Sequence, residues 1–556
     1  MSAGRVDHII LGNVITLDEK STIAEGIAIA GDRIAAVGSR KDILALKTAQ
    51  TRVTDTGHTV IPGFNDTHAH MDTEGLRERF PSLGRVRSIA DVLQRIAALA
   101  RETPRGEWIV TMPVGDPPFY FGGPAVLAEK RMPNAAELDR AAPDHPVCIL
   151  PPSGYWSLLP CYTALNSLGL KLNGLDRSSQ PRVAGIELER DAKGDLTGIV
   201  IENNYPDSAQ IDLLPAVPRF SAEDRCEGLR RSIDAYHRMG TTSVYEGHGC
   251  AAEVIDAYRD LWQNNELTMR MGLVVSPVWS SVAEAKSHMR DWLSLARDRG
   301  FGDSYLRAGG IFISYGGEPT SAAVSQARPW DLGWSCYIKQ ANDPKEFEEL
   351  CEHAALHNLR VHTIVIDKLN EVLPILERIH ARYNISGRRW VLEHMSYAAY
   401  DDLARLKPLG IGVTLIPDYH VWKVGTRFFD MPEDMRELVS PVVQLAKLGV
   451  PVATGTDNSP YNPLAVMRTM RTRAERTTGT VIGRNACASA ELALRAMTAN
   501  GAWFTFEEHI KGRLQNGFYA DIAIFDGDPL QRPPDDLLNL RCLATMSGGR
   551  FVHSML

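Results

Sequence analysis

Between residues 219 and 501 the sequence alternates short runs of strand-forming residues with helical stretches. The strand-like runs are Thr242–Tyr245, Met271–Ser276, Gly310–Ser314, Leu359–Ile366, Arg389–His394, Gly412–Ile416 and Val450–Thr454. Helices are expected at Ser221–Met239, Pro344–His357, Ala399–Leu406 and Ser440–Leu448, among others. Strands separated by helices pair in parallel, and the segment Phe64–His70 brings the number of strands to eight. The pattern predicts an α/β fold and favours a closed TIM-like (β/α)8 barrel over an open sheet, although the count alone does not decide between them.

The two ends of the chain share a different pattern, in which short strand-forming runs are separated by glycine turns. This pattern covers residues 1–61 and returns at residues 502–556. Neither piece is large enough to enclose a hydrophobic core alone. We therefore expect one composite β-sandwich domain built from both ends, with a barrel of residues 62–80 and 219–501 inserted into it.

Residues 81–218 interrupt the alternation. The stretch is rich in proline and glycine and contains a hairpin-like segment, Val183–Ile201, with a turn at Ala192–Gly194. We expect an insertion after the first barrel strand that forms a lid or a wall of the pocket.

The charge and composition of the chain exclude several classes of function. The formal net charge is −8 and the charges of both signs are interspersed, so nothing favours nucleic acid as a partner. No uninterrupted apolar window reaches the roughly 18 residues that a membrane helix needs, and the first residues lack a secretory pattern. The eight cysteines include no CxxC pair and indicate reduced thiols. We therefore expect a cytoplasmic protein that acts on a small molecule without binding membranes.

The strongest local motif is Pro62-Gly63-Phe64-Asn65-Asp66-Thr67-His68-Ala69-His70. Side chains two residues apart in a strand point to the same face, so His68 and His70 can both face one metal ion. A lone HxH pair is weak evidence. Its position after a β-rich segment and a Pro-Gly turn strengthens the prediction of a metal site.

Three further polar residues end strand-like runs of the predicted barrel: His362, His394 and Asp457. Barrel enzymes carry their chemistry at this end of the strands. For any one of the three taken alone, a structural role is the better explanation. Their recurrence on successive strands, together with His68 and His70, favours a common site.

Other residues near predicted strand ends are candidates for substrate binding, and for each of them a purely structural role remains open. They are Glu246, His248, Trp330, Trp334, Tyr419 and His420. In contrast, His237, His353, His357 and His380 lie on predicted helices and are expected to be structural or exposed.

The order HxH, His, His, Asp on a barrel flanked by a composite β domain resembles the amidohydrolase superfamily. More narrowly, the chain resembles amidohydrolase family 3, with its YtcJ-like and N-substituted formamide deformylase-like enzymes. The motifs that carry the resemblance are PGFNDTHAH, LERDAKGDLTGIVIEN, WVLEH, GTDNSPYNP and the closing MTANGAWF…KGRLQNGFYADIAIFDGDP. The resemblance implies a homo-oligomer, such as a dimer.

The resemblance also implies a role for each candidate. His68, His70 and His362 would ligate the metal, with Asp457 beside the metal and its water. His394 would ligate a second metal or bond the substrate carbonyl. Asp457 and His394 are thus the expected catalytic residues, because Asp457 can accept the proton of a metal-activated water and His394 can stabilise the developing oxyanion.

One departure from the family bears on the number of metal ions. Many relatives carry a lysine on the fourth strand that is carbamylated to bridge two metals. The corresponding stretch, Arg307–Gly317, contains no lysine, and Phe312 stands near the expected position. We therefore predict one divalent ion, zinc first, with iron or manganese as alternatives, unless Glu246 or Glu318 replaces the bridge.

These features predict a metal-dependent amidohydrolase that cleaves a carbon–nitrogen bond, amide-type and non-peptide, in a small molecule. Two alternatives stay open: a deaminase or decarboxylase that uses the same metal site, and a scaffold homologue that has lost catalysis.

Overall fold

A computed structural model describes residues 6–152, 156–203, 208–291, 293, 297–327, 338 and 340–556, and only the backbone of His248. The chain divides into two compact units. The first comprises Met1–Met71, Arg230–Tyr315 and Asn342–Leu556, and the second comprises Asp72–Leu229 and Gly316–Ala341. No helix among the described residues is long and apolar enough to cross a membrane.

The first unit contains the predicted barrel of eight parallel strands. In the order in which they pair, they are β18 (Val452–Thr454), β17 (Gly412–Leu415), β16 (Val391–Glu393), β15 (Val361–Ile364), β14 (Leu306–Phe312), β12 (Arg270–Val275), β11 (Thr241–Cys250) and β5 (Phe64–Asp66). A short strand, β13 (Phe301–Gly302), pairs antiparallel with β14. All eight strands overlap the segments expected from sequence, although β14 begins earlier and β11 ends later than expected, and the prediction of an α/β barrel is confirmed.

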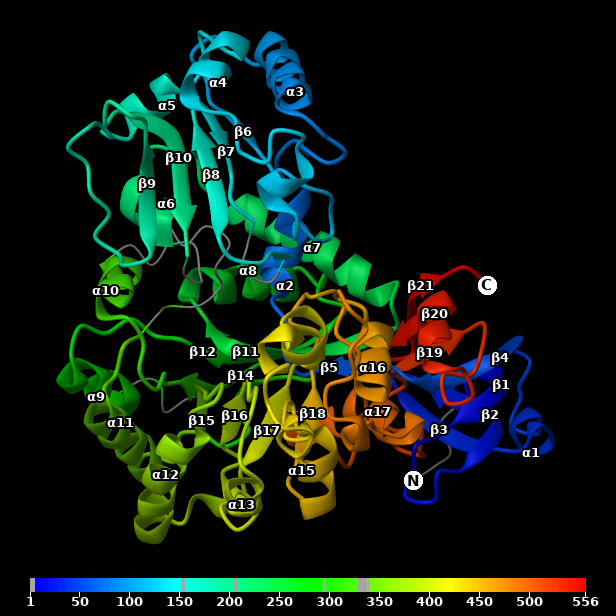
Figure 1. Ribbon diagram of the computed structural model, residues 1–556. Coiled ribbons are helices and arrows are strands. Elements are labelled where there is room, and N and C mark those ends of the chain that lie inside the picture. Colours follow the sequence, from blue (N-terminus) through cyan, green and yellow to red (C-terminus); the bar gives the residue numbers. More distant parts are fainter. Residues whose placement is uncertain are drawn as a thin grey trace. The chain divides into compact units, whose positions relative to one another are not determined.

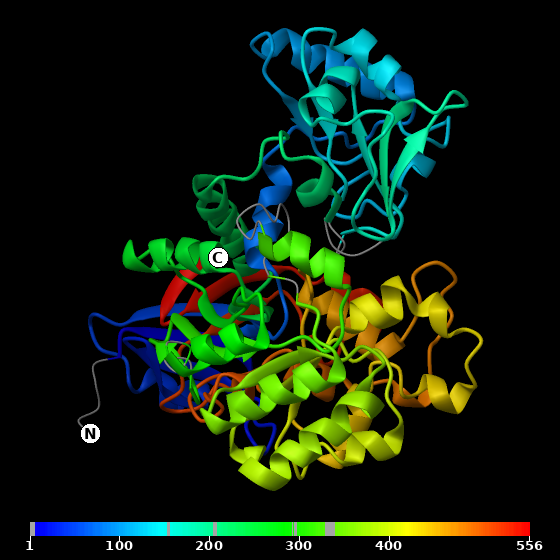
Figure 2. The ribbon, with the colours of Figure 1, turned by 90° about the vertical axis from the view of Figure 1, so that its left-hand side faces the viewer.

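Helices cover the outside of the barrel. They are α8 (Ala252–Gln263), α9 (Val282–Asp291), α11 (Pro344–Leu356), α12 (Leu369–Tyr383), α13 (Tyr400–Ala404), α14 (Glu433–Arg436), α15 (Val442–Leu448), α16 (Pro463–Thr472), α17 (Ala490–Ala496) and α18 (Gly501–Phe504), and α7 (Ala222–His237) precedes β11. In Figure 2 the green to yellow-green helices lie in front of the strands. Side chains of α11, α12 and α15 share one buried core with apolar residues of β15, β16 and β17.

The barrel is held together differently at its seam, between β5 and β18. Among the described residues no backbone ladder pairs these two strands. Instead the Asp66 carboxylate accepts hydrogen bonds from the Thr456 amide at 3.0 Å, the Thr456 hydroxyl at 2.6 Å and the His68 amide at 3.2 Å. The Asp457 amide donates to the His68 carbonyl oxygen at 2.7 Å. The Asp66 carboxylate and a single backbone hydrogen bond therefore replace the missing ladder at the point where the first and last strands meet.

Strands from both ends of the chain form one seven-stranded sheet in the first unit. Its order is β21 (Arg550–Ser554), β20 (Cys542–Ser547), β19 (Ile522–Phe525), β4 (Arg52–Pro62), β1 (His8–Ile15), β2 (Ile23–Ala30) and β3 (Arg33–Gly38), and helix α1 (Arg40–Leu44) follows β3. The blue and red strands lie together in Figure 1. One buried core includes apolar side chains from both halves of the strand order, so the sheet folds over itself into a sandwich-like body.

The second unit has a five-stranded sheet and its own core. The strand order is β6 (Ile109–Thr111), β7 (Val147–Ile149), β8 (Cys161–Leu165), β10 (Leu196–Glu202) and β9 (Ile186–Arg190). Its helices are α3 (Ile89–Glu102), α4 (Ala135–Ala141), α5 (Ser167–Leu172), α6 (Ser208–Leu213) and α10 (Pro319–Ala327), and α2 (Met71–Glu74) lies where the chain enters it. The antiparallel pair β9–β10 is the hairpin expected near Ala192–Gly194.

This unit is larger than the insertion expected at residues 81–218. It begins at Asp72, extends to Leu229 and also includes Gly316–Ala341, which follows β14 in the chain. A core of apolar side chains from α3, α4 and the sheet shows that the segment is a packed domain. The sequence analysis did not predict this core. The segment is rich in proline and glycine, and two of its strands, β6 and β7, are only three residues long. A role as lid or pocket wall stays a prediction.

His237 at the end of α7 makes the stability of the first unit dependent on pH. The ring is buried and bonds the Thr241 carbonyl and the Thr268 hydroxyl, each at 2.9 Å, and burial lowers its pKa to about 4. The unfolded chain binds a proton near the ordinary value of about 6.5. Stability is therefore complete above pH 6.5 and is lost as the pH falls toward 4.

Between pH 7.5 and 5 the unfolding free energy of the wild type should fall by roughly 2 kcal/mol more than that of His237→Gln, which has no imidazole to protonate. Urea unfolding at both pH values measures this difference. The exposed His509→Gln serves as the control and should follow the wild type. Equal pH dependence in His237→Gln and the wild type would contradict the assignment.

Candidate metal centre

Three of the predicted residues meet at the seam of the barrel: His68, His70 and Asp457. Their ligand atoms all lie within 4.8 Å of one another, and the three side chains are buried. His70 Nε2 lies 3.2 Å and His68 Nε2 3.7 Å from Asp457 Oδ1. Strand β5 ends at Asp66, so the two histidines follow the strand instead of lying within it as expected. They reach the same point because the seam holds the backbone of this segment against β18.

His394 lies next to this cluster. Its Nε2 is 3.0 Å from His68 Nε2, and it directly follows β16. Both His394 and Asp457 adopt a left-handed backbone, with φ of 54° and 50°. Such conformations are costly for residues other than glycine and occur often at functional sites. Burial lowers the pKa of His394 to about 4, so its imidazole is neutral at pH 7.

The structure does not bring His362 into the ligand cluster. Its Nε2 lies 2.9 Å from the Tyr245 hydroxyl, and its Nδ1 lies 2.8 Å from Glu393 Oε1. Both ring nitrogens thus face protein groups, and this differs from the expected set of three imidazole ligands. The sequence placed His362 on the correct strand but carried no information on the direction of its ring.

Carboxylates lie behind both histidines of the cluster. Glu393 Oε2 is 3.7 Å from His68 Nδ1, and Glu246 Oε2 is 3.7 Å from His70 Nδ1. Metal-bound histidines are commonly oriented by a carboxylate on the second nitrogen. Glu246 also accepts hydrogen bonds from the Met71 amide, at 2.9 Å, and from the Tyr258 hydroxyl. Glu246, expected among the substrate-binding candidates, therefore lies where it can orient His70.

Asn458 fixes the backbone of His70. Its Oδ1 accepts the His70 amide at 3.1 Å and its Nδ2 donates to the His70 carbonyl at 2.7 Å. The Tyr236 hydroxyl donates to the same Oδ1 at 2.7 Å. Sequence reasoning missed these supporting residues. The available signal was their position inside the conspicuous motifs, since Asp66, Glu393 and Asn458 each lie within two residues of a candidate ligand.

The remaining substrate-binding candidates divide into two groups. Tyr419 and His420 lie on a turn of π-helix after β17, η7 (Asp418–Lys423), and their rings are 6.1 and 5.9 Å from that of His394. They therefore stand beside the cluster. The side chain of His248 and the whole of Trp330 and Trp334 lie outside the described part of the chain.

Comparison with known proteins gives consistent matches. The model of the amidohydrolase family matches residues 56–553. An N-substituted formamide deformylase of Arthrobacter pascens is 25% identical over 97% of each chain, and the putative amidohydrolase YtcJ of Bacillus subtilis is 23% identical over 89% of each. A metal-dependent hydrolase of Pyrococcus horikoshii superposes with a TM-score of 0.69 at 19% identity, covering 95% of this chain and 99% of its own. A zinc complex of the Arthrobacter aurescens atrazine chlorohydrolase TrzN gives a TM-score of 0.53 at 17% identity, covering 98% and 95%.

The ring of His68 depends on a glycine at the end of β11. A Cβ atom on Gly247 would lie 2.3 Å from His68 Nδ1 and 3.1 Å from Glu393 Oε2. Gly247→Ala therefore displaces the ring and its carboxylate. We expect zinc affinity to fall by roughly 10- to 100-fold, the usual cost of losing an orienting contact. A competition titration with a chromogenic chelator measures the change.

Gly387→Ala is the matched control, because a Cβ atom at that glycine would meet nothing within 4 Å. Its zinc affinity should equal that of the wild type. If Gly247→Ala also bound zinc with unchanged affinity, the His68 ring would not be the ligand that this geometry implies.

Proposed function

This chain belongs to the amidohydrolase family, a family of hydrolases that act on carbon–nitrogen bonds, and we propose that it cleaves a small non-peptide amide at the cluster of His68, His70 and Asp457. The observation that supports this most strongly is the convergence of three buried ligand atoms within 4.8 Å. The Asp457 Oδ1 atom is buried and accepts no hydrogen bond from the described residues. A buried carboxylate oxygen beside two imidazoles suits a divalent cation, so these residues fit a metal.

We propose one metal ion, zinc first, with iron or manganese as alternatives. Strand β14 contains no lysine that could bridge two ions. Of the two other candidates for a bridge, Glu246 accepts hydrogen bonds from the Met71 amide and the Tyr258 hydroxyl through one carboxylate oxygen, and Glu318 accepts them from the amides of Thr320 and Ser321. Two imidazoles and one carboxylate leave room for water and substrate, as in catalytic sites. When bound, such an ion lowers the pKa of water to about 7 and so supplies hydroxide at neutral pH.

Asp457 and His394 provide the proton chemistry. The Asp457 carboxylate accepts the proton of the attacking water and delivers it to the departing nitrogen, because an amine leaves readily only once it is protonated. His394, neutral at pH 7 and next to His68, donates one N–H to the substrate carbonyl oxygen as negative charge develops there. His420 and Tyr419, beside His394, contact the remainder of the substrate.

We propose N-substituted formamides as the substrate class. A named relative, 25% identical over almost the entire length of both chains, is an N-substituted formamide deformylase. Hydrolysis would release formate and a primary amine.

The metal content of the purified protein tests the cluster. We expect about one zinc, iron or manganese ion per chain in the wild type by elemental analysis. His68→Ala/His70→Ala should contain none, whereas His58→Ala/His509→Ala, which changes two histidines outside the cluster, should retain the ion. A wild type without metal after growth with added zinc and iron would contradict the proposal and favour a non-catalytic scaffold.

Product analysis with N-benzylformamide tests the reaction. We expect equimolar formate and benzylamine from the wild type, and a fall in kcat of roughly 10² to 10⁴ in Asp457→Asn at matched metal occupancy, because the proton carrier is lost. His394→Asn should lower kcat by roughly 10² through loss of the carbonyl contact. Exposed Asp367→Asn serves as the control. Release of ammonia or carbon dioxide from other substrates, without formamide cleavage, would favour the deaminase or decarboxylase alternative.

A further inference from the structure

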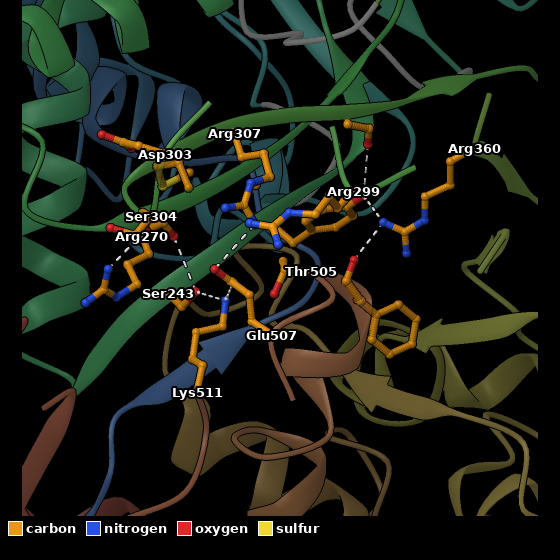
Figure 3. Close-up of a pocket in the computed structure, with 15 residues that line it drawn as sticks. Ser243, Arg270, Arg299, Asp303, Ser304, Arg307, Arg360, Thr505, Glu507 and Lys511 are labelled. Carbon is orange, nitrogen blue, oxygen red and sulfur yellow. Dashed lines mark hydrogen bonds and ion pairs between the residues drawn. The ribbon is translucent and has the colours of Figure 1, made fainter. Parts of the chain in front are cut away.

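A small cavity lies in the first unit, at the amino-terminal ends of the barrel strands. Its space is about 20 Å³, enough for one occupant of the size of a water molecule. Figure 3 shows the lining residues, with Glu507 lying between Arg307 and Lys511. The lining includes Tyr245, Arg270, Arg307, Arg360, Glu507 and Lys511. The cavity shares no residue with the cluster of His68, His70 and Asp457.

Positive charge exceeds negative charge around this cavity. The carboxylates nearby already have partners: Asp521 lies 2.7 Å from Arg270, and Glu507 lies 2.7 Å from Lys511 and 3.4 Å from Arg307. Asp303, which also lines the cavity, accepts hydrogen bonds from the Trp262 indole and from the Tyr305 and Leu306 amides. One acidic side chain thus serves two cations, and none of these carboxylates is left for Arg360. A buried charge is costly unless it is paired and hydrogen-bonded.

Arg360 carries the unbalanced charge. It is 2% exposed and bonds only uncharged groups: the Arg389 and Phe504 carbonyl oxygens, each at 2.6 Å, and the Tyr245 hydroxyl at 3.0 Å. Its Nη2 is buried and has no hydrogen-bond partner among the described residues. Desolvation lowers the pKa of this guanidinium and outweighs the opposing influence of Tyr245 and Glu393.

We propose that this cavity binds a small inorganic anion of the size of chloride, held by Arg360 and the neighbouring cations. The space admits a single small ion and is too small for phosphate or a carboxylate ligand. A guanidinium N–H aimed at the anion supplies a charge-assisted hydrogen bond. The site is distinct from the proposed hydrolase site, because its lining residues do not include His68, His70 or Asp457.

A chain of polar contacts connects the anion site to the centre of the barrel. Arg360 donates to the Tyr245 hydroxyl, which lies 2.9 Å from His362 Nε2. His362 in turn contacts Glu393, the carboxylate behind His68. The anion therefore fixes the guanidinium on which this chain of polar contacts rests, and it acts as a structural ion of the barrel interior.

Bromide replaces chloride and scatters anomalously, so it locates the site directly. Crystals of the metal-loaded wild type grown without chloride and soaked in sodium bromide should show an anomalous peak within hydrogen-bond distance of Arg360 Nη2. Bromide peaks confined to the molecular surface, with a water molecule in the cavity, would overturn the proposal.

Thermal unfolding at constant ionic strength tests the binding in solution. Sodium chloride replacing sodium gluconate should raise the wild-type Tm in a saturable manner, by about 2 °C. Arg360→Met should lose this response, and the uncharged Arg360→Gln replaces it if the methionine variant does not fold. The matched control is Arg473→Met, another buried arginine that bonds backbone carbonyls, of Ile482 and Val439, outside the cavity. Equal responses in the Arg360 variant and the wild type, or no response in the wild type, would overturn the proposal.

Discussion

The barrel depends on the way its first and last strands meet. Seven strand-to-strand junctions are backbone ladders. The eighth is made by one buried carboxylate, Asp66, which binds the hydroxyl and amide of Thr456, and by one backbone hydrogen bond from Asp457 to His68. Burial raises the pKa of Asp66 to about 7 in spite of these hydrogen bonds. A ladder would have fixed β5 against β18 along its full length. Without a ladder, the chain changes direction just after both strands, and His68, His70 and Asp457 lie in these segments.

Polar groups continue from this seam through the interior of the barrel. Glu393 lies between His68 and His362, and the Tyr245 hydroxyl lies between His362 and Arg360. Burial raises the pKa of Glu393 well above its usual range and lowers that of His362 well below it. A barrel interior built in this way has little tolerance for substitution, because each group is a partner of the next. An unsatisfied group in such a network costs more than a missing apolar contact.

The barrel strands could be predicted because strand-like runs alternate with helices, even though β5, β16 and β18 are only three residues long. His68, His70 and Asp457 could be predicted as site residues because they lie in or directly after such runs. The sequence also identified the family correctly. The direction of the His362 ring was not predictable, because it depends on Tyr245 and Glu393, which come from other strands. The core of the second unit escaped prediction because its strands and helices do not alternate regularly along the chain. Gly247 escaped because its requirement arises only from the approach of His68, which is distant in sequence.

The strand order of the seven-stranded sheet affects how the chain folds during its synthesis on the ribosome. Pro62 at the end of β4 pairs with Ile522 in β19, so the sheet cannot be completed until almost the entire polypeptide has been made. At typical rates of synthesis, β1–β4 wait on the order of a minute with one edge of β4 unpaired and half of their core missing. Such an edge is a site of aggregation. The nascent protein therefore exposes the unpaired edge of β4 until β19 has been made, and a chain that stops short of β19 never covers that edge.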